Sequence, residues 1–222
     1  MAIIAFSGYA RSGKDTAALI MQYLLSQTEL PFTLNELIQP GAEEKFAPML
    51  AEMCEWRKMS FAFNVKKVVS ILTGIPLTTL MYDQSIKEQE LGREWDFPIY
   101  RPNHEHPFLI PMTVREALQK VGTDALRDNF HKDVWVNSLL GKYKDTSKWV
   151  ITDLRFQNEA LALRQKDAVL VRISREGVVP ANNHPSETDL DDFPFDYYIQ
   201  NDGDVANLML QVLQLVKKLQ IL

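Results

Sequence analysis

The feature that most constrains the fold of this chain is a glycine-rich turn near its amino terminus, Gly8 to Thr16 (GYARSGKDT). The turn follows an apolar run at residues 3–6 and precedes a helical pattern at residues 17–21. A buried strand, a glycine-rich turn and a helix in this order form the setting of a phosphate-binding loop. Glycines let the backbone curl so that successive N–H groups face an anion, and the start of the helix adds unpaired donors and a partial positive charge. The sequence therefore predicts that this turn binds phosphate.

Within the turn, we expect Lys14 to reach the outer phosphates as a flexible, solvated cation. Asp15 stands where Ser or Thr is usual in such loops, and Thr16 follows it. Because Mg²⁺ accepts any hard oxygen, the sequence leaves open whether Thr16, Asp15 or a water molecule held by Asp15 binds the metal. A glycine-rich turn that merely opens a helix is the alternative, and the preceding strand with Lys14 in register favours phosphate binding.

Composition narrows the class of protein. The 222 residues suffice for one α/β domain, or for a domain with an inserted lobe, and 46% hydrophobic residues are ordinary for a globular chain. The formal net charge of −5 argues against a nucleic-acid polymer as partner, but not against a small phosphorylated substrate. Cys54 is the single cysteine, and no acidic or cysteine cluster supports a metal site at His104, His106 or His184. Without a signal-peptide pattern or an apolar run of membrane-spanning length, we expect a cytosolic enzyme that does not act at a membrane.

Apolar strands alternate with helical patterns along the chain. We expect strands at 2–7, 148–153, 168–173 and 195–199, and helices at 14–26, 42–56, 59–72, 113–121, 135–143, 156–165 and 205–219. Pro48 should interrupt the second helix, and Gly74 should end the third. Residues 76–111 have no clear period. The alternation predicts an α/β fold, a three-layer sandwich of the P-loop NTPase type with a mostly parallel sheet. We expect one domain, 1–222, with a helical substrate-binding insert at about 40–145.

Several charged residues follow the predicted strands, and the ligands of parallel sheets bind beyond the carboxyl ends of the strands. Asp153 can hold a water molecule on Mg²⁺ or accept a hydrogen bond from a substrate hydroxyl. Arg155 would grip phosphate oxygens, with an ion pair to Glu159, four residues later, as the structural alternative. Arg172 and Arg175 end another strand, where an arginine neutralises a transferring phosphoryl group or stacks on adenine. A solvated strand end is the alternative for both.

The segment around residues 119–124 joins two predicted helices. Gly122 permits a tight turn there, and Thr123 or Asp124 would cap the next helix, which is a sufficient structural reason for these residues. A phosphate and a base, however, need cations, amides and a ring to stack against. Residues of these types surround the turn: Arg115, Arg127, Asn129 and Trp135.

These residues together resemble those of bacteriophage deoxynucleoside monophosphate kinases, over nearly the whole chain. The resembling segments are 6–16, 114–119, 122–124, 129–130, 135, 151–155, 158–160, 184–187 and 201–203. The GKDT form of the loop is typical of this group, and the part from Arg115 through Gly122 and Thr123 to Trp135 is the most specific. Ala10 stands where some relatives have a basic residue. Residues 76–111 match weakly, so contacts that select the base are not carried over.

The resemblance implies ATP- and Mg²⁺-dependent phosphorylation of a deoxynucleoside monophosphate to its diphosphate, in the host cytoplasm during phage nucleotide metabolism. A homodimer is compatible with it. ATP would bind to Gly8, Arg11, Ser12, Gly13, Lys14, Asp15, Thr16 and Arg172, with the metal at Asp15 or Thr16. The monophosphate would bind to Lys66, Arg115, Gln119, Gly122, Thr123, Arg127, Asn129, Trp135 and Glu159. The catalytic set would be Lys14, Asp153, Arg155 and Arg175. Two alternatives stay open: a kinase of phosphomevalonate or dephospho-coenzyme A, and a non-catalytic ATP-binding adaptor.

Overall fold

The computed structural model describes residues 3–26, 29–39, 42–102, 105–180 and 185–221. The chain forms two compact units. Unit 1 comprises Met1–Phe61 and Val136–Leu222, and unit 2 comprises Ala62–Trp135. Unit 2 falls within the region of about 40–145 that the sequence predicts as a substrate-binding insert, and that role stays a prediction. His104 and His184 lie outside the described residues.

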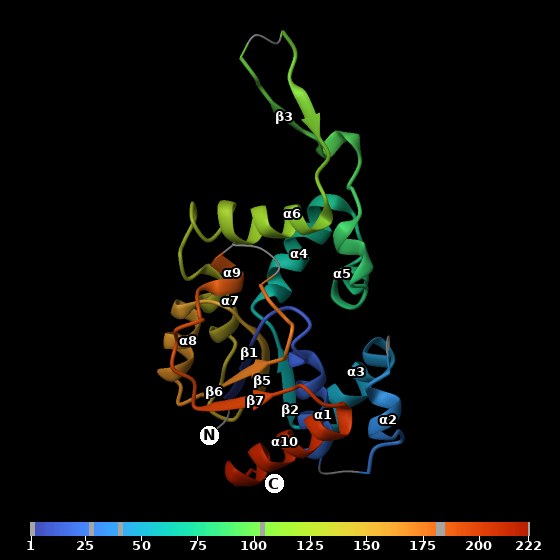
Figure 1. Ribbon diagram of the computed structural model, residues 1–222, viewed down its shortest axis with the longest axis vertical. Coiled ribbons are helices and arrows are strands. Elements are labelled where there is room, and N and C mark those ends of the chain that lie inside the picture. The colour runs from blue at the N-terminus through green and yellow to red at the C-terminus, as the bar shows by residue number, and fades with distance from the viewer. Residues whose placement is uncertain (1–2, 27–28, 40–41, 103–104, 181–184, 222) are drawn as a thin grey trace. The chain divides into compact units, whose positions relative to one another are not determined.

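Unit 1 is built around a five-stranded sheet (Figure 1). Its strand order is β2 (Trp56–Met59), β5 (Lys148–Leu154), β1 (Ile3–Ser7), β6 (Val169–Ser174) and β7 (Tyr197–Gln200). All four neighbouring pairs are parallel. The predicted α/β class with a parallel sheet is therefore confirmed. The carboxyl ends of all five strands meet at one edge of this sheet.

Helices cover both faces of the sheet because its connections run in opposite directions. The connection from β1 to β2 crosses β5, whereas the connection from β5 to β6 crosses β1. Right-handed crossovers then place α1 (Lys14–Leu24) and α8 (Gln157–Arg164) on opposite faces, which gives three layers. The amphipathic helix α10 (Val205–Lys218) packs beside α1 (Figure 1), and its Val212 is fully buried in their shared core.

The remaining helices of unit 1 are shorter or lie at its border. α2 (Leu34–Leu37) and α3 (Ala42–Met53) form a small separate core with α1, in which Leu37 is fully buried. α7 (Val134–Leu140) begins at the end of unit 2, and α9 (Pro185–Thr188) is a single turn before β7.

Unit 2 contains α4 (Ala62–Thr73), α5 (Leu77–Tyr82) and α6 (Val114–Gln119) around a core of Val69, Leu80, Val114 and Ala117. The predicted capping box at the start of α6 is confirmed. Glu116 N donates to Thr113 Oγ1 at 3.2 Å, and Thr113 N donates to the Glu116 carboxylate at 2.8 Å. Such reciprocal bonds satisfy two otherwise unpaired donors.

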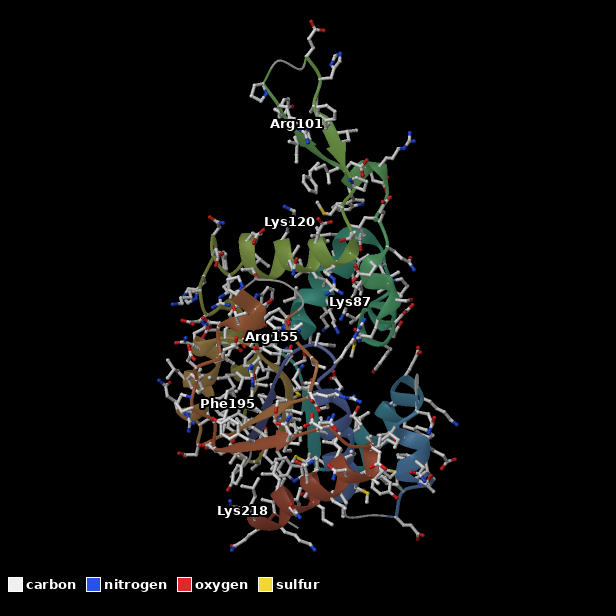
Figure 2. The ribbon with its side chains drawn as sticks, in the orientation of Figure 1. Lys87, Arg101, Lys120, Arg155, Phe195 and Lys218 are labelled. Atoms are coloured by element: carbon white, nitrogen blue, oxygen red, sulfur yellow. The ribbon has the colours of Figure 1, made fainter. Side chains whose placement is uncertain are left out.

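The region without clear periodicity forms two short 3₁₀ helices, Ser85–Glu88 and Arg93–Trp95, and an antiparallel hairpin, β3 (Phe97–Ile99) with β4 (Phe108–Ile110). The predicted helical insert therefore also carries strands. Figure 2 labels Arg101 on this hairpin, where its guanidinium lies 4.9 Å from the centre of the Phe108 ring.

Three local predictions are wrong. Pro48 lies inside α3 instead of interrupting it. Residues 56–59 are a strand, whereas we expected Met59 to begin a helix; Trp56 is buried in the sheet, and pairing with β5, some 90 residues later, sets this strand. Gly122 does not make a tight turn, because the helix continues through a π-helical turn, Lys120–Ala125. Gly74 does end α4, with a left-handed φ of 74°. No helix of the described ranges has both the length and the apolarity that crossing a bilayer requires.

Candidate active site

The predicted phosphate-binding loop joins β1 to α1 at the carboxyl edge of the sheet. At each of its two glycines, both the backbone conformation and the lack of space exclude a side chain. Gly8 has a φ of 150°, and a Cβ there would lie 2.2 Å from the carbonyl oxygen of Ile173. Gly13 has a φ of 100°, and a Cβ there would lie 2.4 Å from the amide nitrogen of Asn201. Arg11 also has a left-handed φ, 68°. The loop is thus wound tightly against β6 and the end of β7.

The first turn of α1 presents its backbone donors without a side-chain cap. Gly13 is the N-cap residue, and because it has no side chain it makes no side-chain cap hydrogen bond to the helix start. Uncapped N–H groups at the beginning of a helix attract anions. The Ser12 hydroxyl is buried beside them and has no hydrogen-bond partner in the part of the chain that the structure describes. The end of the loop therefore offers several donors to one ligand.

Lys14 is buried, contrary to the expectation of a solvated side chain. It is 8% exposed, and its Nζ donates to the Tyr9 carbonyl oxygen at 2.6 Å. Burial and, to a lesser extent, the nearby Arg155 cation together lower the pKa of Lys14 to about 8, against the opposing effect of Asp15 and other carboxylates. A phosphate group beside it would raise this pKa again and so favour the charged form of the lysine.

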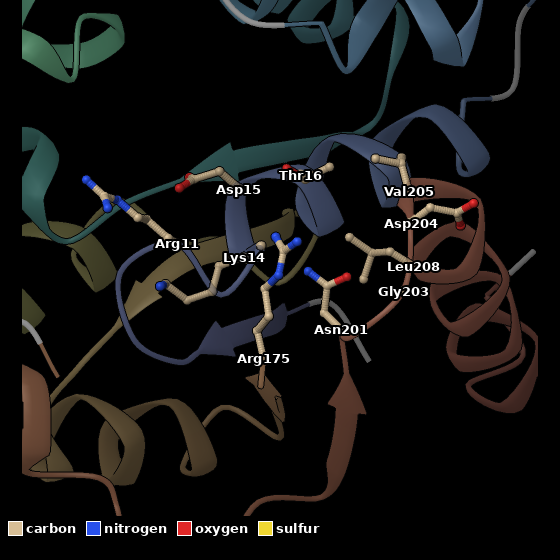
Figure 3. A pocket seen from close by; sticks show the side chains of 11 residues that line it. Arg11, Lys14, Asp15, Thr16, Arg175, Asn201, Gly203, Asp204, Val205 and Leu208 are labelled. Carbon is tan, nitrogen blue, oxygen red and sulfur yellow. The ribbon is translucent and has the colours of Figure 1, made fainter. Parts of the chain in front are cut away.

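A pocket of about 420 Å³ opens beside the loop (Figure 3). From the loop and α1 it is lined by Arg11, Gly13, Lys14, Asp15 and Thr16, which the sequence predicts to bind ATP. From the opposite side it is lined by Arg175, Asn201, Gly203, Asp204, Val205 and Leu208. Figure 3 shows Arg175 reaching from the end of β6 towards the start of α1, next to Asn201. The predicted Arg175 therefore lies where a ligand of the loop would extend.

The sequence interpretation missed the role of Asn201. This side chain is 5% exposed, and its amide donates to the Ser12 carbonyl oxygen at 2.9 Å. Its backbone N–H donates to the Ser174 carbonyl oxygen at 2.8 Å. Asn201 thereby ties the end of β7 to both the loop and β6. An asparagine among polar residues directly after a predicted strand was the available signal.

Asp153 and Asp15 each have a partner from the segment around β2. The Asp153 carboxylate accepts from the Ser60 hydroxyl at 2.7 Å and from the Phe61 N–H at 2.9 Å. Asp15 forms an ion pair with Lys58 at 3.1 Å, and the Asp15 side chain is 65% exposed. Neither Lys58 nor Ser60 was predicted to lie at the site, because β2 was not predicted from the sequence.

Arg155 and Glu159, for which an ion pair was the structural alternative, meet through the backbone of Arg155. The buried Glu159 carboxylate accepts from the backbone N–H groups of Arg155 at 2.9 Å and Phe156 at 3.1 Å, at the start of α8. The Arg155 guanidinium (labelled in Figure 2) instead donates to Glu187 at 2.5 Å and to the Ser186 carbonyl oxygen at 3.2 Å.

Arg172, near the end of β6, contacts several neighbours, among them the Phe195 ring at 5.7 Å from its guanidinium. It donates to the Ser7 hydroxyl at 3.1 Å and to the Asp191 carboxylate at 2.7 Å. Its guanidinium also lies 5.0 Å from the centre of the Tyr9 ring. Arg172 therefore supports the phosphate-binding loop from the side of β1, while Arg175 faces the pocket.

The residues predicted to bind the monophosphate, apart from Glu159, all belong to unit 2. The indole N–H of Trp135 donates to the Gly122 carbonyl oxygen at 2.6 Å, and the Asn129 amide donates to the Asp124 carbonyl oxygen at 2.5 Å. Both contacts fix the π-helical turn, a type of turn that is frequent at functional sites. Elsewhere in unit 2, Arg115 donates to Glu88 through Nε at 2.8 Å. Of the other predicted members, Lys66 lies on α4, Gln119 on α6 and Thr123 in the π-helical turn, and Arg127 lies two residues after that turn.

The donor set at the loop fits Mg²⁺ better than a metal that needs several protein ligands. Within the described ranges, no group of three or more His, Cys, Asp or Glu side chains could hold a metal ion. Mg²⁺ usually keeps several waters and takes one or two protein oxygens together with phosphate oxygens. Thr16 and the exposed Asp15 carboxylate line the pocket and supply such oxygens.

Comparisons with known proteins point in the same direction. The sequence profile of a family described as deoxynucleotide monophosphate kinase matches residues 84–212, more than half of the chain. A mimivirus protein of this description (Acanthamoeba polyphaga mimivirus) is 31% identical over 118 residues, 47% of this chain and 61% of that protein. The deoxynucleotide monophosphate kinase of Enterobacteria phage T4 is 28% identical over 112 residues, 48% of this chain and 46% of that protein. That of Escherichia phage RB69 is 26% identical over 98% of this chain and 100% of its own length. The matches thus span less than two thirds of the first two relatives and the whole of the third.

Proposed function

This chain belongs to the deoxynucleotide monophosphate kinase family, and from that premise we propose that it transfers the γ-phosphoryl group of ATP to a deoxynucleoside monophosphate. The observation that carries the proposal is the uncapped start of α1, which opens beside the buried Lys14 into the pocket at the carboxyl edge of the sheet. Phosphoryl transfer needs such a cradle of backbone donors with a lysine at the outer phosphates. We propose host cytoplasm as the compartment, since the relatives named above come from viruses.

We assign the donor site to the pocket of unit 1. The N–H groups after Gly13 and the Ser12 hydroxyl would hold the phosphate chain of ATP, and Lys14 would reach its β- and γ-phosphates. Arg175 would extend along the same chain of phosphates. The base would then lie towards Gly203 and Val205, on the side of the pocket lined by the start of α10.

Mg²⁺, when bound, neutralises charge on the transferring phosphate. Thr16 and Asp15 are the residues that we propose to hold it, directly or through water. Because Asp15 pairs with Lys58, the lysine would keep this carboxylate in place beside the loop.

We assign the acceptor to unit 2, with Arg115 and Lys66 on its phosphate and Gly122, Thr123, Asn129 and Trp135 around its sugar and base. Gln119 and Arg127 complete this proposed set. For Glu159 we propose an indirect part, because its carboxylate holds the backbone of Arg155. Light scattering of the purified protein would test the homodimer that the resemblance allows.

The proposed reaction needs little acid–base chemistry. An oxygen of the acceptor phosphate is already anionic, and it attacks the γ-phosphorus while the bond to the β–γ bridging oxygen breaks, which releases ADP. Alignment and charge neutralisation then supply the catalysis. Lys14, Arg155 and Arg175 would stabilise charge on the transferring group, and Asp153 would orient the acceptor or a metal-bound water.

The test is ADP release from ATP and Mg²⁺ by the purified protein, with each of the four natural deoxynucleoside monophosphates in turn. We expect release that depends on at least one of them and that is lost in Lys14→Ala. Stimulation by phosphomevalonate or dephospho-coenzyme A alone would identify a different kinase. ATP binding without turnover for any acceptor would identify an adaptor.

A further inference from the structure

We propose that Glu187, on α9, is a positioning residue that fixes the guanidinium of Arg155 in the orientation in which this arginine meets a phosphate. The inference rests on the proposed function, because it assigns Glu187 a part in the same site. Glu187 lies outside every set of residues that the sequence analysis singled out for binding or catalysis.

The contact between the two side chains is short and sheltered. Arg155 Nη1 lies 2.5 Å from Glu187 Oε1, and the Glu187 side chain is only 10% exposed. The same Nη1 donates to the Ser186 carbonyl oxygen at 3.2 Å. A guanidinium carries five N–H donors, and within the described part of the chain both hydrogen bonds of this guanidinium use Nη1. The remaining edge of the fork, Nε and Nη2, suits two oxygens of a phosphate group.

Arg155 is held at both of its ends. Glu159 accepts from its backbone N–H at 2.9 Å, and Glu187 accepts from its guanidinium. A long arginine side chain otherwise loses conformational freedom when it binds a ligand. Because Arg155 is restrained at both ends, its side chain is already ordered in the folded protein, so binding a phosphate costs less conformational entropy.

The position of Glu187 is itself determined by the fold. The Asp189 carboxylate accepts from the Gln157 N–H at 2.8 Å, and the Gln157 amide donates to the Asp189 carbonyl oxygen at 3.0 Å. These bonds tie the end of α9 to the start of α8, two residues after Arg155. The fold thus places the Glu187 carboxylate beside Arg155 at the end of β5, although the two residues are 32 positions apart in the sequence.

A competing role gives an effect of the opposite sign. If Glu187 merely occupied Arg155 in place of the phosphate, its neutralisation would release the arginine and strengthen acceptor binding. If Glu187 positions Arg155, neutralisation weakens binding and transfer, because a charge-assisted hydrogen bond becomes an ordinary one. The sign of the change therefore separates the two roles.

The experiment compares Glu187→Gln with Asp192→Asn in the full chain. Both variants remove one negative charge from the same segment, five residues apart, but only the first removes the carboxylate that contacts Arg155, and Asp192 is exposed. We expect Glu187→Gln to raise the KM for the monophosphate about five- to tenfold and to lower kcat by a similar factor, with the KM for ATP changed less than about twofold. Asp192→Asn should stay close to wild type in all three constants.

A double variant and a measurement without turnover complete the test. In the Arg155→Ala background, Glu187→Gln should have no further effect on kcat or KM, because a positioning residue acts only through its partner. Nitrogen NMR should show slowly exchanging Nη protons of Arg155 in the wild type, assigned with Arg155→Lys, and their loss in Glu187→Gln. Equal kinetics of the two single variants, a lower KM in Glu187→Gln or unchanged NMR signals would overturn the inference. Absence of monophosphate-dependent ADP release in the wild type would instead overturn the proposed function, and the NMR comparison would still decide the role of Glu187.

Discussion

Replacing Lys14 by methionine should abolish phosphoryl transfer and at the same time stabilise the protein at neutral pH. The lysine is 8% exposed, and its pKa falls from 10.5 to about 8. The difference corresponds to about 3 kcal/mol by which the folded state disfavours the charged amine. Methionine has a similar length and no charge, but it loses the hydrogen bond to the Tyr9 carbonyl oxygen, which contributes about 1 kcal/mol. We therefore expect a gain of about 2 kcal/mol in the free energy of unfolding at pH 7.

The pH dependence of this gain has a definite sign. Below about pH 8, Lys14 is charged in both the folded and the unfolded chain, so the whole penalty acts on the wild type. Between about 8 and 10.5 the folded chain releases the proton while the unfolded chain keeps it, and the wild type recovers stability. The advantage of Lys14→Met should therefore shrink steadily as the pH rises through this window.

Urea denaturation of wild type and Lys14→Met at several pH values between 7 and 10 measures the effect. Lys166→Met, at an exposed position, is the control and should follow the wild type at every pH. A destabilised Lys14→Met at pH 7, or a difference that does not change with pH, would refute the account of a buried, charge-penalised lysine.

Four further outcomes are expected. Binding of ATP with Mg²⁺ at pH 8 should be accompanied by uptake of about half a proton, because the phosphates raise the pKa of Lys14 from about 8. Calorimetry in two buffers of different ionisation enthalpy measures this uptake, and Lys14→Met should show none from this site. Gly13→Ala should weaken ATP binding more than about tenfold and lower the melting temperature, since the new Cβ would meet Asn201 at 2.4 Å; calorimetry and thermal unfolding report both. Arg115→Ala should raise the KM for the monophosphate more than that for ATP, and an effect confined to ATP would move this arginine to the donor side. Thr113→Ala should lower the free energy of unfolding by about 1 kcal/mol in urea titrations, since it removes the cap of α6; an unchanged value would contradict that cap.

What could be predicted from the sequence was local. The strand, loop and helix at the amino terminus follow one another within 24 residues, so their pattern is complete in a single stretch of chain. The capping box at Thr113 and the stop at Gly74 depend on three or four neighbouring residues. These elements form where predicted because the interactions that stabilise them lie within one or two turns.

What could not be predicted depends on partners far along the chain. β2 has only four residues and is a strand because it pairs with β5, while its own pattern is compatible with the helix that we expected. The pKa of Lys14 depends on charges that include Arg155 and Glu187, and the contact of Asn201 with the loop joins residues 189 positions apart. No window of sequence contains both members of such pairs.

The arginines show most clearly why composition misleads. Arg115, Arg155 and Arg172 looked like surplus cations awaiting phosphate, yet their carboxylate partners lie 27, 32 and 19 residues away in the chain, at Glu88, Glu187 and Asp191. In a chain with a net negative charge, carboxylates are available to pair with arginines. An arginine that is paired in this way has a fixed orientation before any ligand binds. A phosphate dianion, with more charge and three oxygens, can then add to or displace such a partner. If the phosphate adds to the pair, neutralising the carboxylate should weaken phosphate binding; if the phosphate displaces the carboxylate, neutralising it should strengthen binding. Neutralising Glu187, Asp191 and Glu88 one at a time therefore distinguishes an arginine that its carboxylate positions from one that its carboxylate only occupies.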